Sequence, residues 1–170
     1  MQFELKDIVR AYIAGITDGE GCIYAQKQYD EREGRQKSYY RVCVIYAMIN
    51  KEPLSFIQTH YGGKLDTKPP TPSNKTVFRL TILSDDALQL LEEIEPFLLI
   101  KHRSAKAAMT LQRHIINNYC RIRNGDMSVL VEREVLYQSY RAAAETERAG
   151  VPVEGERSDS PHLIDDKIEG

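Results

Sequence analysis

The alternation of hydrophobic and polar residues predicts helices and short strands that follow one another along most of the chain. Positions 9, 12, 13 and 16 are apolar, at the spacing of one face of an α-helix. We expect this first helix to begin near Asp7 and to end at Gly19 or Gly21, because glycine adopts the left-handed helix cap at no steric cost. Positions 22–28 and 38–49 then alternate with a period of two, which predicts a long antiparallel hairpin.

The rest of the chain continues the helix and strand patterns. A helix is predicted over 53–61, strands over 64–68 and 75–83, and a helix from Ser84 that ends at Pro96. Two further helices are predicted over 103–119 and 128–149. The element order αββαββ, followed by C-terminal helices, indicates an α+β fold. Residues 1–149 would form one domain, and residues 150–170 an acidic tail that we expect to be mobile.

The first helix has a second face made of small residues. Ala11, Ala14, Gly15 and Asp18 repeat the same helical spacing. Small side chains allow another backbone to come close, as at helix–helix contacts. This face is therefore predicted to meet a partner.

Two acids lie at the predicted end of this helix, where the helix dipole is negative. Asp18 and Glu20 are locally unfavourable there, unless a cation lies nearby or the acids have a capping role. A divalent metal with oxygen ligands, Mg²⁺ above all, is one interpretation. A helix that ends in a polar, glycine-rich turn is the other.

Residues 13–21, IAGITDGEG, resemble the defining motif of the LAGLIDADG homing endonucleases, with Thr17 in place of an apolar residue and Glu20 in place of the commoner Asp. The resemblance covers about residues 7 to 120. It implies that Glu20 and the Gly19 carbonyl hold Mg²⁺, a site that Mn²⁺ or Ca²⁺ can also occupy, at the scissile phosphate. It implies an active-site lysine at Lys101, in the segment Pro96–Lys101, and a solvent-positioning residue at Asn50.

The chain departs from the family pattern at one further position, and the resemblance implies a sheet that binds DNA. Leu54 stands where single-motif relatives have an Arg, so that role is unfilled or moves to Lys51. In the family the curved antiparallel sheet is a saddle for DNA, whereas a sheet with one solvated face is polar there in any protein. The polar and basic residues expected on the DNA-binding face are Tyr24, Gln26, Gln28, Arg35, Lys37, Arg41, Lys64, Lys68 and Arg79.

Composition and charge are compatible with a DNA-binding protein. The net charge of −2 is uneven, because residues 150–170 carry −4 and the first 149 residues carry +2. Three cysteines without a C-x-x-C pair argue against a disulfide framework or a zinc site. No apolar run has the length of a membrane span and the N-terminus lacks a signal-peptide pattern, so we expect an intracellular protein, in the cytoplasm or an organelle.

The resulting hypothesis is a Mg²⁺-dependent homing endonuclease that cuts double-stranded DNA. One motif per chain predicts a homodimer through the small helix face, and hence a long pseudo-palindromic target. The alternative on the same fold is an intron RNA maturase or a DNA-binding protein that does not cut. A third hypothesis is an α+β domain that dimerises through its first helix without binding nucleic acid.

Overall fold

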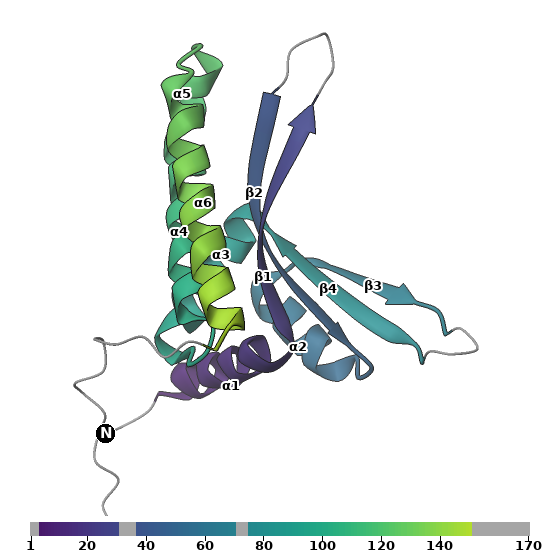
Figure 1. The fold of residues 1–170 in the computed structure, drawn as a ribbon. Helices are drawn as coiled ribbons and strands as arrows, with labels where there is room; N and C mark the ends of the chain where they lie inside the picture. Colours follow the sequence, from purple (N-terminus) through teal and green to yellow (C-terminus); the bar gives the residue numbers. More distant parts are fainter. Residues whose placement is uncertain (1–3, 31–36, 71–74, 151–170) are drawn as a thin grey trace, which may run out of the picture.

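The computed structural model describes residues 4–30, 37–70 and 75–150, with the backbone alone at 29, 30, 37 and 38. Arg35 and the predicted tail beyond Gly150 lie outside the described residues. The elements confirm the predicted αββαββ order and the C-terminal helices (Figure 1). They are α1 (Leu5–Glu20), β1 (Gly21–Asp30), β2 (Lys37–Met48), α2 (Glu52–Tyr61), β3 (Lys64–Lys68), β4 (Val77–Leu83), α3 (Ser84–Ile94), the 3₁₀ turn η2 (Glu95–Phe97), α4 (His102–Asn117), α5 (Tyr119–Arg123) and α6 (Ser128–Arg148).

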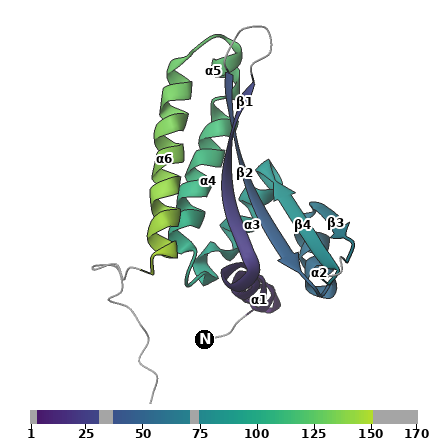
Figure 2. The same cartoon turned by 45° about the vertical axis from the view of Figure 1, so that its right-hand side comes forward.

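The four strands form one antiparallel sheet in the order β1-β2-β4-β3. β1 pairs with β2 from Gly21↔Tyr46 outward, whereas β4 pairs with β2 only between Cys43 and Met48. The far half of the β1–β2 hairpin therefore continues as a two-stranded ribbon, which stands clear of β4 in Figures 1 and 2. The whole sheet is strongly twisted and curved.

One face of the sheet carries the hydrophobic core and is covered by helices. On β2 the alternation predicted from the sequence is confirmed, since Tyr40, Val42, Val44 and Tyr46 are all buried. α3, α4 and α6 contact the strands from this side, and Figure 2 shows α4 and α6 running along the β1–β2 ribbon. The opposite face of the sheet has no covering element among the described residues.

The helix α1 is rotated relative to the predicted stripes. Tyr12, expected in the core, is 52% exposed, and Ala14, expected on the partner face, is fully buried. Ile13, Ala14 and Thr17 are the buried side chains of α1. The prediction was wrong because the buried face of α1 lies between the two stripes and takes Ile13 from the large one and Ala14 from the small one, where a short alanine lets α1 lie closer to its neighbours.

Gly21 ends α1, but not through the left-handed conformation that was predicted. Its φ of −79° and ψ of 144° are those of an extended residue, so the chain passes straight from helix to strand. A Cβ at Gly21 would lie 2.8 Å from the Cα and carbonyl oxygen of Thr17 and 3.0 Å from the Tyr46 ring. Glycine is thus required here by close packing and not by its backbone angles.

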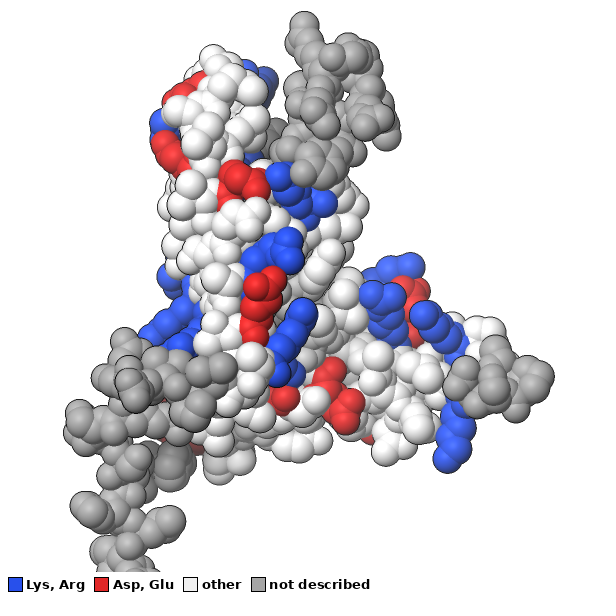
Figure 3. All heavy atoms as spheres, viewed as in Figure 1, with Lys and Arg blue, Asp and Glu red and all other residues white. Residues whose placement is uncertain are grey.

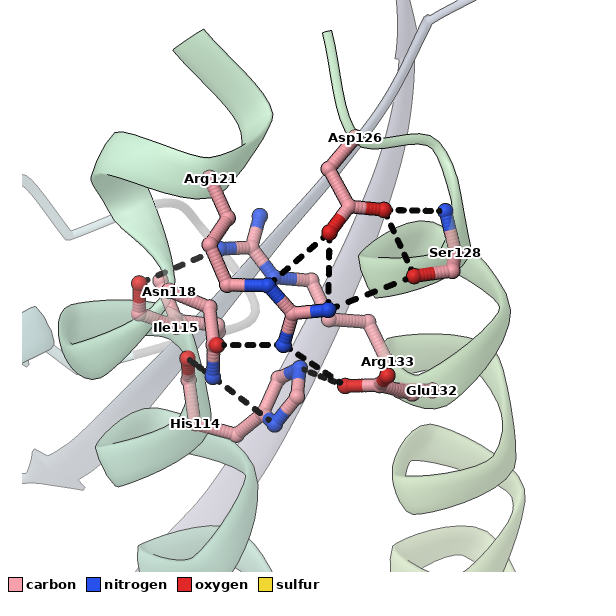
Figure 4. A network of polar contacts seen from close by, with 8 residues as sticks. All are labelled: His114, Ile115, Asn118, Arg121, Asp126, Ser128, Glu132 and Arg133. Atoms are coloured by element: carbon pink, nitrogen blue, oxygen red, sulfur yellow. Dashed lines mark hydrogen bonds and ion pairs between the residues drawn. The ribbon is translucent and has the colours of Figure 1, made fainter. Parts of the chain in front are cut away.

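The predicted helix over 103–119 is interrupted at Asn118, between α4 and α5. The Asn118 amide donates to the carbonyl oxygen of His114 at 3.0 Å, a local bond that competes with helix continuation. Figure 4 shows the polar network that holds this end of the helices. In it Arg121 Nε donates to Asp126 Oδ2 at 2.9 Å, and Arg133 Nη2 donates to the Ile115 carbonyl at 3.0 Å.

Candidate metal centre and nucleic-acid interface

The oxygens of Glu20 and Gly19 lie exposed at the C-terminal end of α1, where the helix leads into β1. No hydrogen bond or ion pair to the Glu20 carboxylate occurs within the described part of the chain. The Gly19 carbonyl likewise has no hydrogen-bond donor among the described residues. Both groups are hard oxygen donors with free lone pairs.

Lys101 lies beside these oxygens, at the point where α4 begins. Its ammonium group donates to three main-chain carbonyls at the end of α1: Thr17 at 2.7 Å, Asp18 at 2.8 Å and Gly21 at 2.6 Å. An ammonium has three N–H donors. All three are used, so Lys101 has none left for a phosphate in this conformation.

Asp18 makes the reciprocal contact from α1 to the start of α4. Its carboxylate accepts the backbone N–H groups of Leu99 at 2.7 Å, Ile100 at 3.2 Å and Lys101 at 3.0 Å. A carboxylate is favourable at a helix N-terminus and an ammonium at a helix C-terminus. Lys101 therefore caps the C-terminus of α1, and Asp18 holds the bend that leads into α4, whose first-turn N–H groups bond to Glu147. We call Asp18 and Lys101 together the helix clamp.

The helix clamp explains how one of the two acids at the end of α1, Asp18, is stabilised there. For Asp18 the protein itself supplies the nearby cation, Lys101, and the Asp18 carboxylate is satisfied by three main-chain N–H groups of the bend before α4. Burial lowers the pKa of Lys101, while the nearby carboxylates of Asp18, Glu147 and Glu20 oppose this shift. Glu20 has no hydrogen-bond or ion-pair partner among the residues that the structure describes, so the metal interpretation now depends on Glu20 and the Gly19 carbonyl.

The oxygens present fit a Mg²⁺ ion that takes its remaining ligands from elsewhere. No group of three or more His, Cys, Asp or Glu side chains in the described residues is able to hold a metal ion by itself. Mg²⁺ commonly uses one or two carboxylates, several waters and substrate phosphates. Glu20 and Gly19 would thus supply part of a site that a phosphate and water complete.

The uncovered sheet face carries most of the residues predicted for DNA binding. The strand register places Gln26 opposite Arg41 and Asp66 opposite Arg79 on this face. Figure 3 shows Lys and Arg side chains gathered over β3 and β4. Seven predicted residues share the face: Tyr24, Gln26, Gln28, Arg41, Lys64, Lys68 and Arg79. Arg35 lies outside the described residues, as does the side chain of Lys37, whose backbone begins β2.

An apolar stripe on α1 is also exposed, and the sequence argument missed part of it. Ile8 and Tyr12 are 57% and 52% exposed, and they share one helix face with Ala11 and Gly15. Nothing lies within 4 Å of a Cβ built on Gly15. Of the four residues predicted for a partner contact, Ala11 and Gly15 are therefore accessible. Ala14 is buried in the chain's own core, and Asp18 belongs to the helix clamp.

Solved structures identify this architecture. The chain is similar to the homing endonuclease I-CvuI, solved with the I-CreI target, at a TM-score of 0.65 and 22% identity over 87% of this chain and 98% of that one. It is similar to the archaeal intron-encoded homing endonuclease I-Vdi141I complexed with DNA, with a TM-score of 0.62 and 16% sequence identity over 91% of both chains. The LAGLIDADG homing endonuclease I-GzeII with its DNA target matches at a TM-score of 0.58 and 17% sequence identity, over 91% of this chain and 54% of that one. The fold is that of the LAGLIDADG homing endonucleases.

Sequence comparison alone did not find these relationships. No protein-family profile matches the chain, and no curated protein sequence matches it significantly. The LAGLIDADG likeness rests on the fold and on residues 13–21. None of the described helices is long and apolar enough to cross a membrane.

The structure also places the other positions that the resemblance singled out. Asn50 follows β2 and is exposed, and no described contact joins it to Glu20. Leu54, at the place expected for an Arg, is fully buried in the core, so no cation is present there. Lys51 is exposed at the start of α2 and is the nearest cation along the chain.

Proposed function

We propose that the protein is a site-specific endonuclease that cuts double-stranded DNA in a Mg²⁺-dependent reaction and initiates intron homing. The observation that carries this proposal is the exposed, unpartnered Glu20 carboxylate beside the Gly19 carbonyl, fixed at the base of a basic sheet face. An acid without a partner repels phosphates, so a protein that only bound DNA would gain nothing from it. A bound Mg²⁺ turns the same acid into an attractive contact.

In this proposal the active protein is a two-fold symmetric dimer. The exposed stripe of Ile8, Ala11, Tyr12 and Gly15 offers an apolar face with a close-approach point at Gly15. A self-complementary contact along this face would bring two copies of Glu20 near the symmetry axis, one for each DNA strand. The 54% coverage of I-GzeII supports this arrangement, because one I-GzeII chain has roughly the length of two such units.

Each residue of the site has a definite task in the proposed reaction. Glu20 and the Gly19 carbonyl would hold Mg²⁺, which when bound polarises the phosphate, lowers the pKa of the attacking water and stabilises the leaving 3′ oxygen. The helix clamp keeps both oxygens at a fixed place relative to β1. Lys101 is thus proposed as a positioning residue, because a direct contact with the phosphate would require it to release one of three carbonyls. Asn50 is proposed to orient solvent.

A DNA-binding protein that cuts slowly or not at all is the second candidate. Two observations favour it: Leu54 is buried where a cation was expected, and the donors of Lys101 are already used. Fewer charges would then stabilise the transition state. The two candidates share the sheet face and differ in cleavage.

The test uses the DNA that flanks the gene. The two flanking sequences are joined into one duplex and incubated with the protein in Mg²⁺, in chelator, and with Glu20→Gln. Cleavage at one site that requires Mg²⁺ and is lost in Glu20→Gln is the expected result, with Glu145→Gln on α6 as an exposed control. Tight binding without cleavage by the wild type would favour the second candidate. Preferential binding of intron RNA would favour a maturase.

A further inference from the structure

The pair formed by Gln26 and Arg41 is the best-defined polar contact on the uncovered sheet face. The two residues are directly opposite in the β1–β2 register, and Arg41 Nη2 donates to Gln26 Oε1 at 2.8 Å. Both side chains are half-buried, and neither has another partner among the described residues. The bond therefore fixes the direction of a long side chain that would otherwise be free to change rotamer.

The pair lies on the part of the sheet that is best shaped to enter a DNA groove. β4 pairs with β2 only as far as Cys43, so Gln26 and Arg41 belong to the two-stranded ribbon. A two-stranded ribbon fits the major groove of B-DNA. The groove is also where the base pairs present distinct donor and acceptor patterns.

Contacts on the other face hold the ribbon in place. Lys27 Nζ bonds to Glu134 Oε2 of α6 at 2.6 Å, and the Tyr40 hydroxyl donates to the same oxygen. The Tyr140 hydroxyl of α6 donates to the Ile23 carbonyl at 2.7 Å. These contacts leave one ribbon face open, the face with Gln26 and Arg41.

The hydrogen bond also decides which base the pair is able to recognise. A free glutamine pairs with adenine, accepting from N6 through its oxygen and donating to N7. Here the Gln26 oxygen is already used by Arg41. The bond takes one of the two lone pairs of that oxygen, and the remaining groups of the pair are mostly N–H donors, from the guanidinium and from the Gln26 amide nitrogen. Guanine, with acceptors at N7 and O6, is the base that matches a set of donors.

We propose that Arg41, positioned by Gln26, reads a guanine in the major groove at one position of each half-site. This inference rests on the proposed function, and it names a sequence element of the DNA target. Gln26 acts as a positioning residue, and its bond to Arg41 competes with the contact that its oxygen would make to adenine. Arg41 supplies the specificity.

The experiment selects bound duplexes from a random DNA library with the full chain in the absence of Mg²⁺. The wild type is compared with Arg41→Gln, Arg41→Lys and Gln26→Leu, and folding is checked by circular dichroism. We expect a guanine preference of about tenfold or more at one position per half-site, the range of a bidentate contact. Arg41→Gln should change that preference to adenine, and Gln26→Leu should weaken it without moving it.

Arg41→Lys separates base reading from charge and does not depend on the glutamine variant folding. It keeps the charge but not the planar pair of donors, so the salt dependence of binding should stay unchanged while the guanine preference weakens. If Arg41 contacts only phosphate, every sequence weakens equally in Arg41→Gln and the salt slope falls by about one. That result overturns the inference and leaves the proposed function intact. Failure of the wild type to bind any duplex at low salt overturns both.

Discussion

The helix clamp should contribute strongly to stability, because Lys101 makes three charge-assisted hydrogen bonds to the end of one helix. Lys101→Met keeps the length of the side chain and removes the ammonium, leaving the carbonyls of Thr17, Asp18 and Gly21 without that donor. A hydrogen bond to a charged group is worth about 1.5–3 kcal/mol. The three bonds share one charge and are not additive, so the expected loss is about 3 kcal/mol in total.

Thermal and urea unfolding of Lys101→Met measure this loss directly. For a chain of this size about 3 kcal/mol corresponds to a melting temperature lower by roughly 6–12 °C. Lys106→Met is the matched control on the same helix, since Lys106 is exposed and its ammonium lies 3.6 Å from Glu95 Oε1. Such a surface pair is worth about 0–1 kcal/mol. Equal destabilisation by the two substitutions would refute the clamp.

Four further substitutions test other parts of the structure. Gly21→Ala should destabilise the fold by about 1–3 kcal/mol, because the added methyl group overpacks against Thr17. Gly15→Ala should leave the melting temperature of the monomer unchanged or higher, and it should weaken self-association measured by sedimentation equilibrium. Thr17→Val should cost about 1–2 kcal/mol in urea unfolding, because it leaves the buried Tyr46 hydroxyl without its 2.8 Å partner. The pKa of Glu134 is lowered to about 2, first by its bond to Lys27, so its stabilising effect is present above pH 4.5 and is lost as pH falls toward 2. Glu134→Gln should abolish that part of the acid unfolding profile.

The sequence was sufficient to predict the strands, the order of the main helices and the open face of the sheet, but not the break at Asn118. The alternation in β2 determines which face of the strand is buried, because moving the register by one residue would expose Val42, Val44 and Tyr46 together. The position of the site also followed from sequence. Residues 13–21 place Glu20 at a helix end, and the resemblance pointed to Lys101 beside it.

The roles of individual side chains in the site did not follow from sequence. Asp18 and Lys101 are 83 positions apart in the chain, and their mutual contacts depend on how the end of α1 meets the bend before α4. The orientation of α1 was also undetermined, because Ala14 suits either a tight core or a helix contact. No local pattern distinguishes these outcomes. Packing with α3 and the sheet decides between them.

The most direct test of the account is a mixed dimer with one wild-type chain and one Glu20→Gln chain, isolated through two different affinity tags. If each Glu20 serves one strand of a symmetric complex, the mixed dimer should nick its target on one strand. The wild-type dimer should make a double-strand break, and the doubly substituted dimer should bind without cutting. Double-strand breaks by the mixed dimer, or by the dimer with two Glu20→Gln chains, would contradict the assignment of Glu20 as the metal-holding acid.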